Sequence, residues 1–139
     1  MSWFKRLVAP PSPLGTDFAL LSLRLWFGLA MAWAHGYGKI TNLEGFTANV
    51  AKMGLPLSSV LGPAAALSEF VGALLIALGL MTRLSAAFLL ITMVVAAFVV
   101  HAADPFQKKE LALSYAVVMG ALLVTGPGRF SVDARLGKR

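Results

Sequence analysis

Four apolar runs, separated by short polar stretches, alternate along this chain. The runs cover residues 17–38, 63–81, 84–100 and 110–125. A helix of about 20 residues rises about 30 Å, which matches the hydrocarbon core of a bilayer. The pattern therefore predicts an all-α fold, a four-transmembrane-helix bundle formed by residues 17–125.

Residues 40–62, between the first two runs, are too polar to span a membrane. Apolar residues recur there at helical spacing while polar residues occupy the other side. The apolar positions are Leu43, Phe46, Val50 and Met53. Such a pattern is typical of a short amphipathic helix in the membrane interface, which we expect Gly54 and Pro56 to end.

The two ends of the chain are expected to lie outside the bundle. Residues 1–16 carry Lys5 and Arg6, and the prolines that follow predict that no helix begins before Phe18. The apolar core of a cleaved signal peptide would come directly after the basic residues, so we expect the first helix to be retained. A Gly-Pro-Gly sequence should stop the fourth helix and leave residues 126–139 as a basic tail.

The composition favours a membrane protein. Hydrophobic residues make up 58% of the 139 residues and charged residues 13%, against about 25% charged in soluble domains. The net charge of +6 is carried by loops and tails, which favours contact with anionic lipid headgroups and argues against a nucleic-acid partner. The absence of cysteine excludes disulfides, thiolate metal ligands and a thiol relay within this chain.

Basic residues are unequally divided between the two sides of the predicted bundle. Seven lie on the side of the termini, or eight with Arg24: Lys5, Arg6, Arg83, Arg129, Arg135, Lys138 and Arg139. Four lie on the other side: Lys39, Lys52, Lys108 and Lys109. Because positive residues concentrate on the cytoplasmic side, we expect cytoplasmic N and C termini and a location in a bacterial inner membrane.

One carboxylate, Glu69, lies inside the otherwise apolar second run. An acid there costs about 2.5–3.5 kcal/mol on insertion scales, so it usually marks a partner or a function. His35, His101 and Glu110 are expected at the same outer end of the bundle, and such groups are suited to proton-coupled work. The structural alternatives are an ion pair for Glu69, headgroup-level hydrogen bonds for the histidines, and a helix-dipole role for Glu110.

The first run carries further candidates around His35. Arg24 shares a helical face with His35 and either reaches toward Glu69 or snorkels to the cytoplasmic side. Trp33 and Tyr37 are expected to anchor the helix at the membrane surface or to wall a pocket for an aromatic headgroup.

Two cofactor alternatives arise from the same residues. Two histidines on different helices are able to ligate a haem, and two histidines with two carboxylates are able to hold a non-haem metal. Haem and metal are both disfavoured, because the chain has two histidines in all and lacks a paired Glu-x-x-His motif.

Several pieces of this sequence, taken in order, resemble the DoxX family of small four-helix membrane proteins. They are Leu23-Arg24-Leu25, His35-Gly36-Tyr37-Gly38-Lys39, Phe46 with Gly54-Leu55-Pro56, the stretch from Glu69 to Arg83, His101, Lys109-Glu110-Leu111-Ala112-Leu113, and the stretch from Gly126 to Asp133. The resemblance implies quinone-linked redox and oxidative-stress functions, and some members are similar to the small subunit of a thiosulfate:quinone oxidoreductase. The absence of cysteine argues against direct sulfur transfer by this chain.

The leading hypothesis is a quinone-interacting redox or stress-protection protein, with the headgroup docked among side chains of the first three helices. The catalytic candidates are Glu69, His35 and His101. The candidates for cofactor binding are Trp33, Tyr37, Lys39, Glu110 and Arg24. The alternatives are a non-catalytic membrane partner that recruits a redox enzyme, and a small-solute transporter, which with four spans would require a homo-oligomer.

Overall fold

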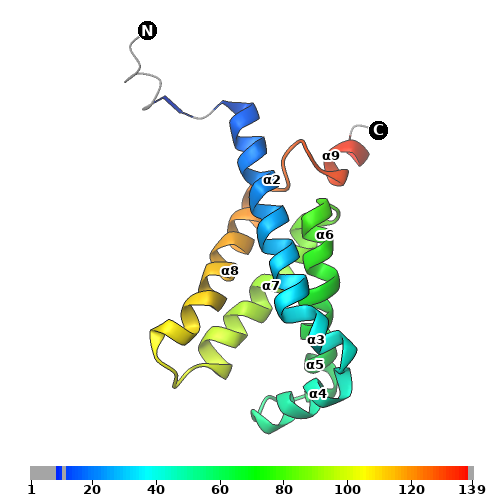
Figure 1. The fold of residues 1–139 in the computed structure, drawn as a ribbon, viewed down its shortest axis with the longest axis vertical. Coiled ribbons are helices and arrows are strands. Elements are labelled where there is room, and N and C mark those ends of the chain that lie inside the picture. The colour runs from blue at the N-terminus through cyan, green and yellow to red at the C-terminus, as the bar shows by residue number, and fades with distance from the viewer. Residues whose placement is uncertain (1–8, 11, 138–139) are drawn as a thin grey trace.

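The computed structural model describes residues 9–10 and 12–137, and all regular structure in this part of the chain is helical. The predicted basic residues Lys5, Arg6, Lys138 and Arg139 lie outside the described residues. Four long helical segments form the body of the described chain (Figure 1). With η marking a π-helical turn, they are α2 (Pro13–Ala30), η1 (Met31–Gly36) and α3 (Tyr37–Thr41); α5 (Ser58–Leu67), η2 (Ser68–Gly72) and α6 (Ala73–Leu78); α7 (Thr82–Val95) and η3 (Ala96–Val100); and α8 (Phe106–Thr125).

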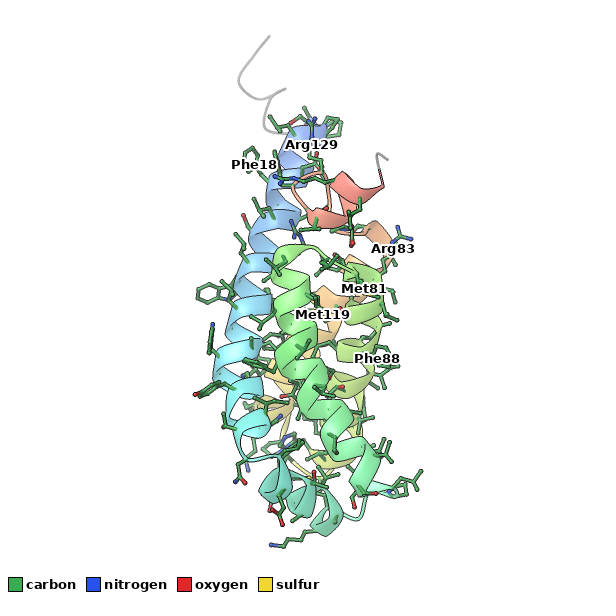
Figure 2. All side chains as sticks on the ribbon, turned by 90° about the vertical axis from the view of Figure 1, so that its right-hand side faces the viewer. Phe18, Met81, Arg83, Phe88, Met119 and Arg129 are labelled. Atoms are coloured by element: carbon green, nitrogen blue, oxygen red, sulfur yellow. The ribbon has the colours of Figure 1, made fainter. Side chains whose placement is uncertain are left out.

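The four segments pack around one core. The first lies against the second through α2–α6 and η1–η2 contacts, α7 lies between the second segment and α8, and α8 also touches α2. The largest fully buried apolar side chains are Met31, Ile76, Leu89, Met119 and Leu122. In Figure 2, Phe88 points outward from α7 while Met119 lies among the helices.

Three of these segments are long and apolar enough to cross a membrane: residues 13–41, 58–78 and 82–100. The fourth, α8, carries Lys108, Lys109 and Glu110 near its start. Large apolar side chains are exposed on the outside of the bundle, among them Trp26, Phe88, Val117 and Val124. A surface with so many exposed apolar side chains is suited to lipid, because soluble proteins rarely expose large apolar patches.

The first helix begins earlier than predicted. Pro13 occupies the first helical position rather than breaking the helix, and the hydroxyl of Ser12 accepts a hydrogen bond from the Gly15 N–H at 3.1 Å. Proline is favoured there because its missing N–H would have no helical partner anyway. At the other end, the π-helical turn carries the segment on to Thr41 instead of ending it near residue 38.

The second segment also differs from its predicted bounds. It begins at Ser58, because the Leu57 carbonyl accepts hydrogen bonds from the N–H groups of Val60 and Leu61, and Pro63 lies inside the helix. It ends at Leu78, where Gly79 adopts a left-handed conformation with φ of 71°. The tight turn to the third segment therefore precedes Thr82, the first residue of α7, so the third segment begins two residues before the predicted residue 84.

The C-terminal residues, predicted to be a basic tail, fold back onto the bundle. Figure 1 places α9 (Val132–Leu136) at one end and α4 (Leu43–Lys52) at the other. The Asp133 carboxylate accepts hydrogen bonds from the N–H groups of Met81 and Thr82 at 2.8 and 2.9 Å, which completes the start of α7. Burial alone would raise the pKa of Asp133, but these backbone hydrogen bonds hold it below its ordinary value.

Candidate functional site

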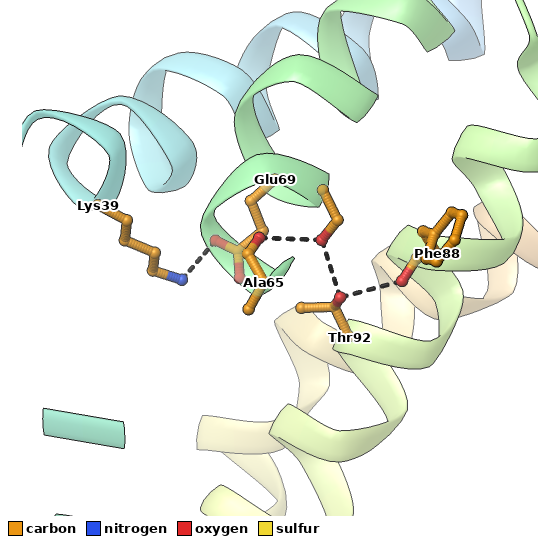
Figure 3. A network of polar contacts seen from close by, with 6 residues as sticks. Lys39, Ala65, Glu69, Phe88 and Thr92 are labelled. Atoms are coloured by element: carbon orange, nitrogen blue, oxygen red, sulfur yellow. Dashed lines mark hydrogen bonds and ion pairs between the residues drawn. The ribbon is translucent and has the colours of Figure 1, made fainter. Parts of the chain in front are cut away.

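The buried acid of the second segment forms an ion pair with Lys39. Glu69 on η2 has a side chain that is 4% exposed, and its Oε2 accepts a hydrogen bond from the Lys39 ammonium on α3 (Figure 3). The Lys39 side chain is 30% exposed, and its Nζ lies 5.0 Å from the centre of the Phe46 ring on α4. Lys39 therefore links three elements, α3, η2 and α4. This geometry is the ion pair that the sequence analysis gave as the structural alternative for Glu69.

Glycine and π-helical backbone bring the two sides of this pair together. A Cβ atom on Gly36 would collide with the Glu69 carbonyl, so η1 and η2 touch backbone to backbone. About two helical turns earlier on the same face, a Cβ atom on Gly28 would come within 2.7 Å of the Ala73 carbonyl. Small residues allow such close approach between helices. π-Helical turns are rare and often found at functional sites, and here two of them meet beside Glu69.

Two hydroxyl groups extend the polar layer to the third segment. The Ser68 and Thr92 hydroxyls lie 2.8 Å apart and form a hydrogen bond between η2 and α7 (Figure 3). Each hydroxyl also lies within hydrogen-bond distance of a carbonyl in its own helical segment. The Ser68 hydroxyl is 2.9 Å from the Ala65 carbonyl oxygen, and the Thr92 hydroxyl is 3.0 Å from that of Phe88. These polar groups thus have partners within the bundle.

An aromatic cluster lies on the outer surface next to the ion pair. The rings of Trp33, Tyr37 and Phe70 have centroids 5.6 to 6.1 Å apart. Trp33 is 60% exposed and Tyr37 is 49% exposed, so both present ring faces to the surroundings. Because Phe70 follows Glu69 in the chain, the cluster and the ion pair share the same helical turns.

The two histidines make contacts other than with the ion pair. The His35 ring packs edge-on against Tyr115 of α8, with centroids 5.9 Å apart, whereas its neighbours Trp33 and Tyr37 pack on η2. The Nδ1 atom of His101 lies 2.7 Å from Oδ2 of Asp104, in the loop before α8. Within the described part of the chain, neither imidazole forms a hydrogen bond with Glu69.

The loop after the third segment holds a separate set of polar contacts among His101, Asp104 and Lys108. The hydrogen bond from His101 lowers the pKa of Asp104 below its ordinary value, and Lys108, 3.7 Å from the carboxylate, acts in the same direction. Glu110 is exposed on α8 and takes no part in this group or in the Lys39–Glu69 pair. Across residues 9–10 and 12–137, no cluster of three or more His, Cys, Asp or Glu side chains is placed to hold a metal ion.

Arg24 neither reaches Glu69 nor snorkels. Its side chain is fully buried, and its guanidinium donates to the carbonyls of Ala77 at 3.2 Å and Phe130 at 2.6 Å. It lies fifteen residues before Lys39 on one continuous helical segment, which is about 22 Å at the rise of an α-helix. Ala77 is near the end of α6, where carbonyls lack helical partners, and its carbonyl and that of Phe130 accept from this buried charge, while Nε has no partner in the described part of the chain.

Sequence reasoning missed three of these contacts. The family resemblance indicates that Lys39 is important but does not identify Glu69 as its partner. Its spacing of four residues from His35 places it on the inner face of the same helix, which was a signal of that contact. The hydroxyl pair of Ser68 and Thr92 carries no recognisable motif. Asp133 follows Ser131, whose hydroxyl caps α9, and this Ser-x-Asp sequence was a signal of a helix start in the supposed tail.

Comparisons with known proteins agree on one family. The DoxX family model matches residues 19–102. The chain is 33% identical over 127 residues to the inner membrane protein YqjF of Escherichia coli (strain K12), an alignment that covers 88% of this chain and 95% of that protein. No solved structure matches.

Proposed function

This chain belongs to the DoxX family of membrane proteins, and on that premise we propose that it binds a quinone-type ring compound from the lipid phase. The proposed contact is the cluster of Trp33, Tyr37 and Phe70 beside the Lys39–Glu69 pair. The observation that carries the proposal is the position of exposed aromatic rings and a mostly buried ion pair on the same helical turns.

The membrane arrangement is part of this proposal. We assign α8 as a fourth span, because it packs along α7 and is apolar after its first turn. We place α4 at the outer membrane surface and both termini in the cytoplasm of a cell whose inner membrane holds the protein, in keeping with the charge distribution and with the name of the relative YqjF.

The residues present suit a flat ring with carbonyl oxygens. Aromatic pairs prefer offset or edge-on contact at centroid distances of about 4.5–7 Å, and a quinone ring can join the cluster in that way. The Lys39 ammonium has three N–H donors, of which Glu69 accepts one, so donors remain for a ring oxygen. When bound, the quinone supplies the redox chemistry, while Lys39 orients the ring and Glu69 holds the lysine in place.

A shallow depression on the surface of α2 and η1 offers a place for an apolar tail. It includes Trp33, which also belongs to the aromatic cluster. Its lining residues are Ser22, Leu25, Trp26, Leu29, Ala30, Trp33 and Ala34. A lipid-soluble quinone would thus place its tail along the helix and its ring at the membrane surface.

Equilibrium binding of a quinone with a short alkyl tail to the purified protein in lipid nanodiscs tests the proposal. We expect saturable binding, weakened at least about fivefold by Trp33→Leu together with Tyr37→Leu, since the two stacking contacts are worth about 0.5–1.5 kcal/mol each. Phe88→Leu is the matched control, because Phe88 is an exposed aromatic on α7 outside the cluster. Equal binding by the double variant and the control would refute the assigned site, and no saturable binding by the unmodified protein would refute the function.

A second candidate function is a non-catalytic membrane partner that recruits a redox enzyme. It is favoured by the satisfied polar layer, in which Glu69 is paired with Lys39, and Ser68 with Thr92. On this reading Glu69→Gln reduces the yield of folded protein, and an organic extract of the purified chain contains no quinone. A quinone recovered in stoichiometric amount from that extract would eliminate this candidate.

A further inference from the structure

The apolar side of α4 is already occupied within the protein. Val50 is buried, and Phe46 lies beneath the Lys39 ammonium. The Thr47 side chain packs so closely on α5 that a Cβ atom on Gly62 would come within 2.8 Å of its hydroxyl. Most of the face that the sequence predicts to rest on the bilayer is therefore turned toward the bundle, and Met53 at its end is the exposed exception.

The exposed apolar residues lie instead at the tip that joins α4 to α5. Met53 is 51% exposed and Leu57 is 74% exposed, and no residue from Met53 to Leu57 is charged. The tip continues an exposed apolar stripe at helical spacing along the second segment, a candidate membrane span. The stripe comprises Val60, Leu61, Leu67, Val71 and Leu78.

The backbone of Leu57 strengthens this observation. Its φ of 51° lies in the left-handed region, which is unfavourable for a residue with a Cβ atom and which glycine or asparagine tolerates better. Its carbonyl supports the start of α5, a role that belongs to the backbone and does not require leucine. Since the side chain is mostly exposed, contacts within the chain do not account for a leucine at this position.

We propose that the Met53–Leu57 tip dips into the bilayer and places the Met53 and Leu57 side chains among the lipid acyl chains next to the headgroups. Lipid is the occupant because the stripe that leads to the tip belongs to a span, whose outward side chains contact acyl chains. The tip, rather than the apolar face of α4, thus anchors this end of the protein to the leaflet.

The absence of cysteine makes a direct test possible. Single cysteines are introduced at Met53, Leu57, Asn49 and Val71, each is labelled with a nitroxide, and the full chain is reconstituted into phosphatidylcholine–phosphatidylglycerol vesicles. Electron paramagnetic resonance then compares collisions of each label with lipid-soluble oxygen and with a water-soluble nickel chelate. Asn49 is the water-exposed reference on α4, and Val71 is the lipid-exposed reference on the second segment.

Oxygen collisions should exceed nickel collisions at positions 53 and 57, as at 71, and the order should reverse at 49. Labels at 53 and 57 that match position 49 would overturn the proposal, because these vesicles contain no other protein that could cover the tip. A Leu57→Asn substitution suits the left-handed backbone but removes the apolar side chain. It should move a label at position 53 toward the nickel reagent, and a label that keeps its oxygen preference would also count against insertion.

Discussion

Removing the lysine of the Lys39–Glu69 pair should destabilise this protein more than neutralising the glutamate. Lys39→Met leaves the Glu69 carboxylate almost wholly buried without a cation. Breaking a fully buried pair in this way costs about 3–5 kcal/mol, and the partial exposure of Lys39 reduces our expectation to about 2–3 kcal/mol. Glu69→Gln keeps the shape of the side chain and leaves a lysine that water can still reach, at a cost of about 1 kcal/mol.

The double variant makes this reasoning sharper. With both charges gone, Lys39→Met with Glu69→Gln should cost about 1–2 kcal/mol, less than the sum of about 3–4 kcal/mol for the single changes. The free energy of unfolding in mixed detergent micelles, followed by the helical circular dichroism signal, measures all three values. Lys52→Met is the control for loss of an exposed lysine on α4.

Two outcomes would contradict the pair as described. Additive costs would mean that the two side chains do not interact energetically. A Glu69→Gln variant less stable than Lys39→Met would mean that the carboxylate, rather than the ammonium, is the better-solvated partner, contrary to their exposures.

Three further predictions concern other contacts of the bundle. Gly36→Ala should lower the free energy of unfolding by about 1–3 kcal/mol, because the new methyl group meets the Glu69 backbone. Gly38 has open space around it, so Gly38→Ala should leave stability unchanged or raise it slightly. Thermal unfolding of the two variants compares them directly. Asp133→Asn should cost about 1–2 kcal/mol through weaker bonds to the start of α7. The pKa of Asp133 in the folded protein lies below its ordinary 3.8, so its contribution to stability is complete above pH 3.8 and is lost as the pH falls through the lower folded value. Hydrogen exchange of the backbone N–H groups at the start of α7 measures this loss. Unchanged exchange in the Asp133→Asn variant would contradict the contact. Arg24→Lys should lower stability by about 1–2 kcal/mol, because a single ammonium cannot reach both of the carbonyls that the guanidinium joins, and a variant as stable as the parent chain would refute that role.

The sequence was most informative where the bilayer itself limits the possibilities. Apolar runs of membrane length produced helices, because a backbone in lipid has to satisfy its own hydrogen bonds. The burial of Glu69 was also predictable from its apolar neighbours. The identity of its partner could not be predicted, because Lys39 and Glu69 lie on two neighbouring segments whose separation depends on Gly36 and on two π-helical turns.

The remaining errors have a common physical origin. The level of a residue in the bundle depends on where its helix begins, and several helices begin earlier than predicted, among them those that start at Pro13, Ser58 and Phe106. Whether a histidine contacts Glu69 depends on which way its ring points, and the His35 ring packs against Tyr115. The position of Arg24 depended on acceptors from residues 53 and 106 positions away, which no local pattern reveals.

The return of the last residues to the bundle has a consequence for how the protein is made. The Arg24 guanidinium on the first helix donates to the Phe130 carbonyl, and the first N–H groups of α7 donate to the Asp133 carboxylate. Both acceptors come late in the sequence. During synthesis the donor groups enter the membrane long before their partners leave the ribosome. The final assembly step must therefore wait until residues 130–133 have been made, and until then these groups on the earlier helices lack the partners that they have in the folded protein.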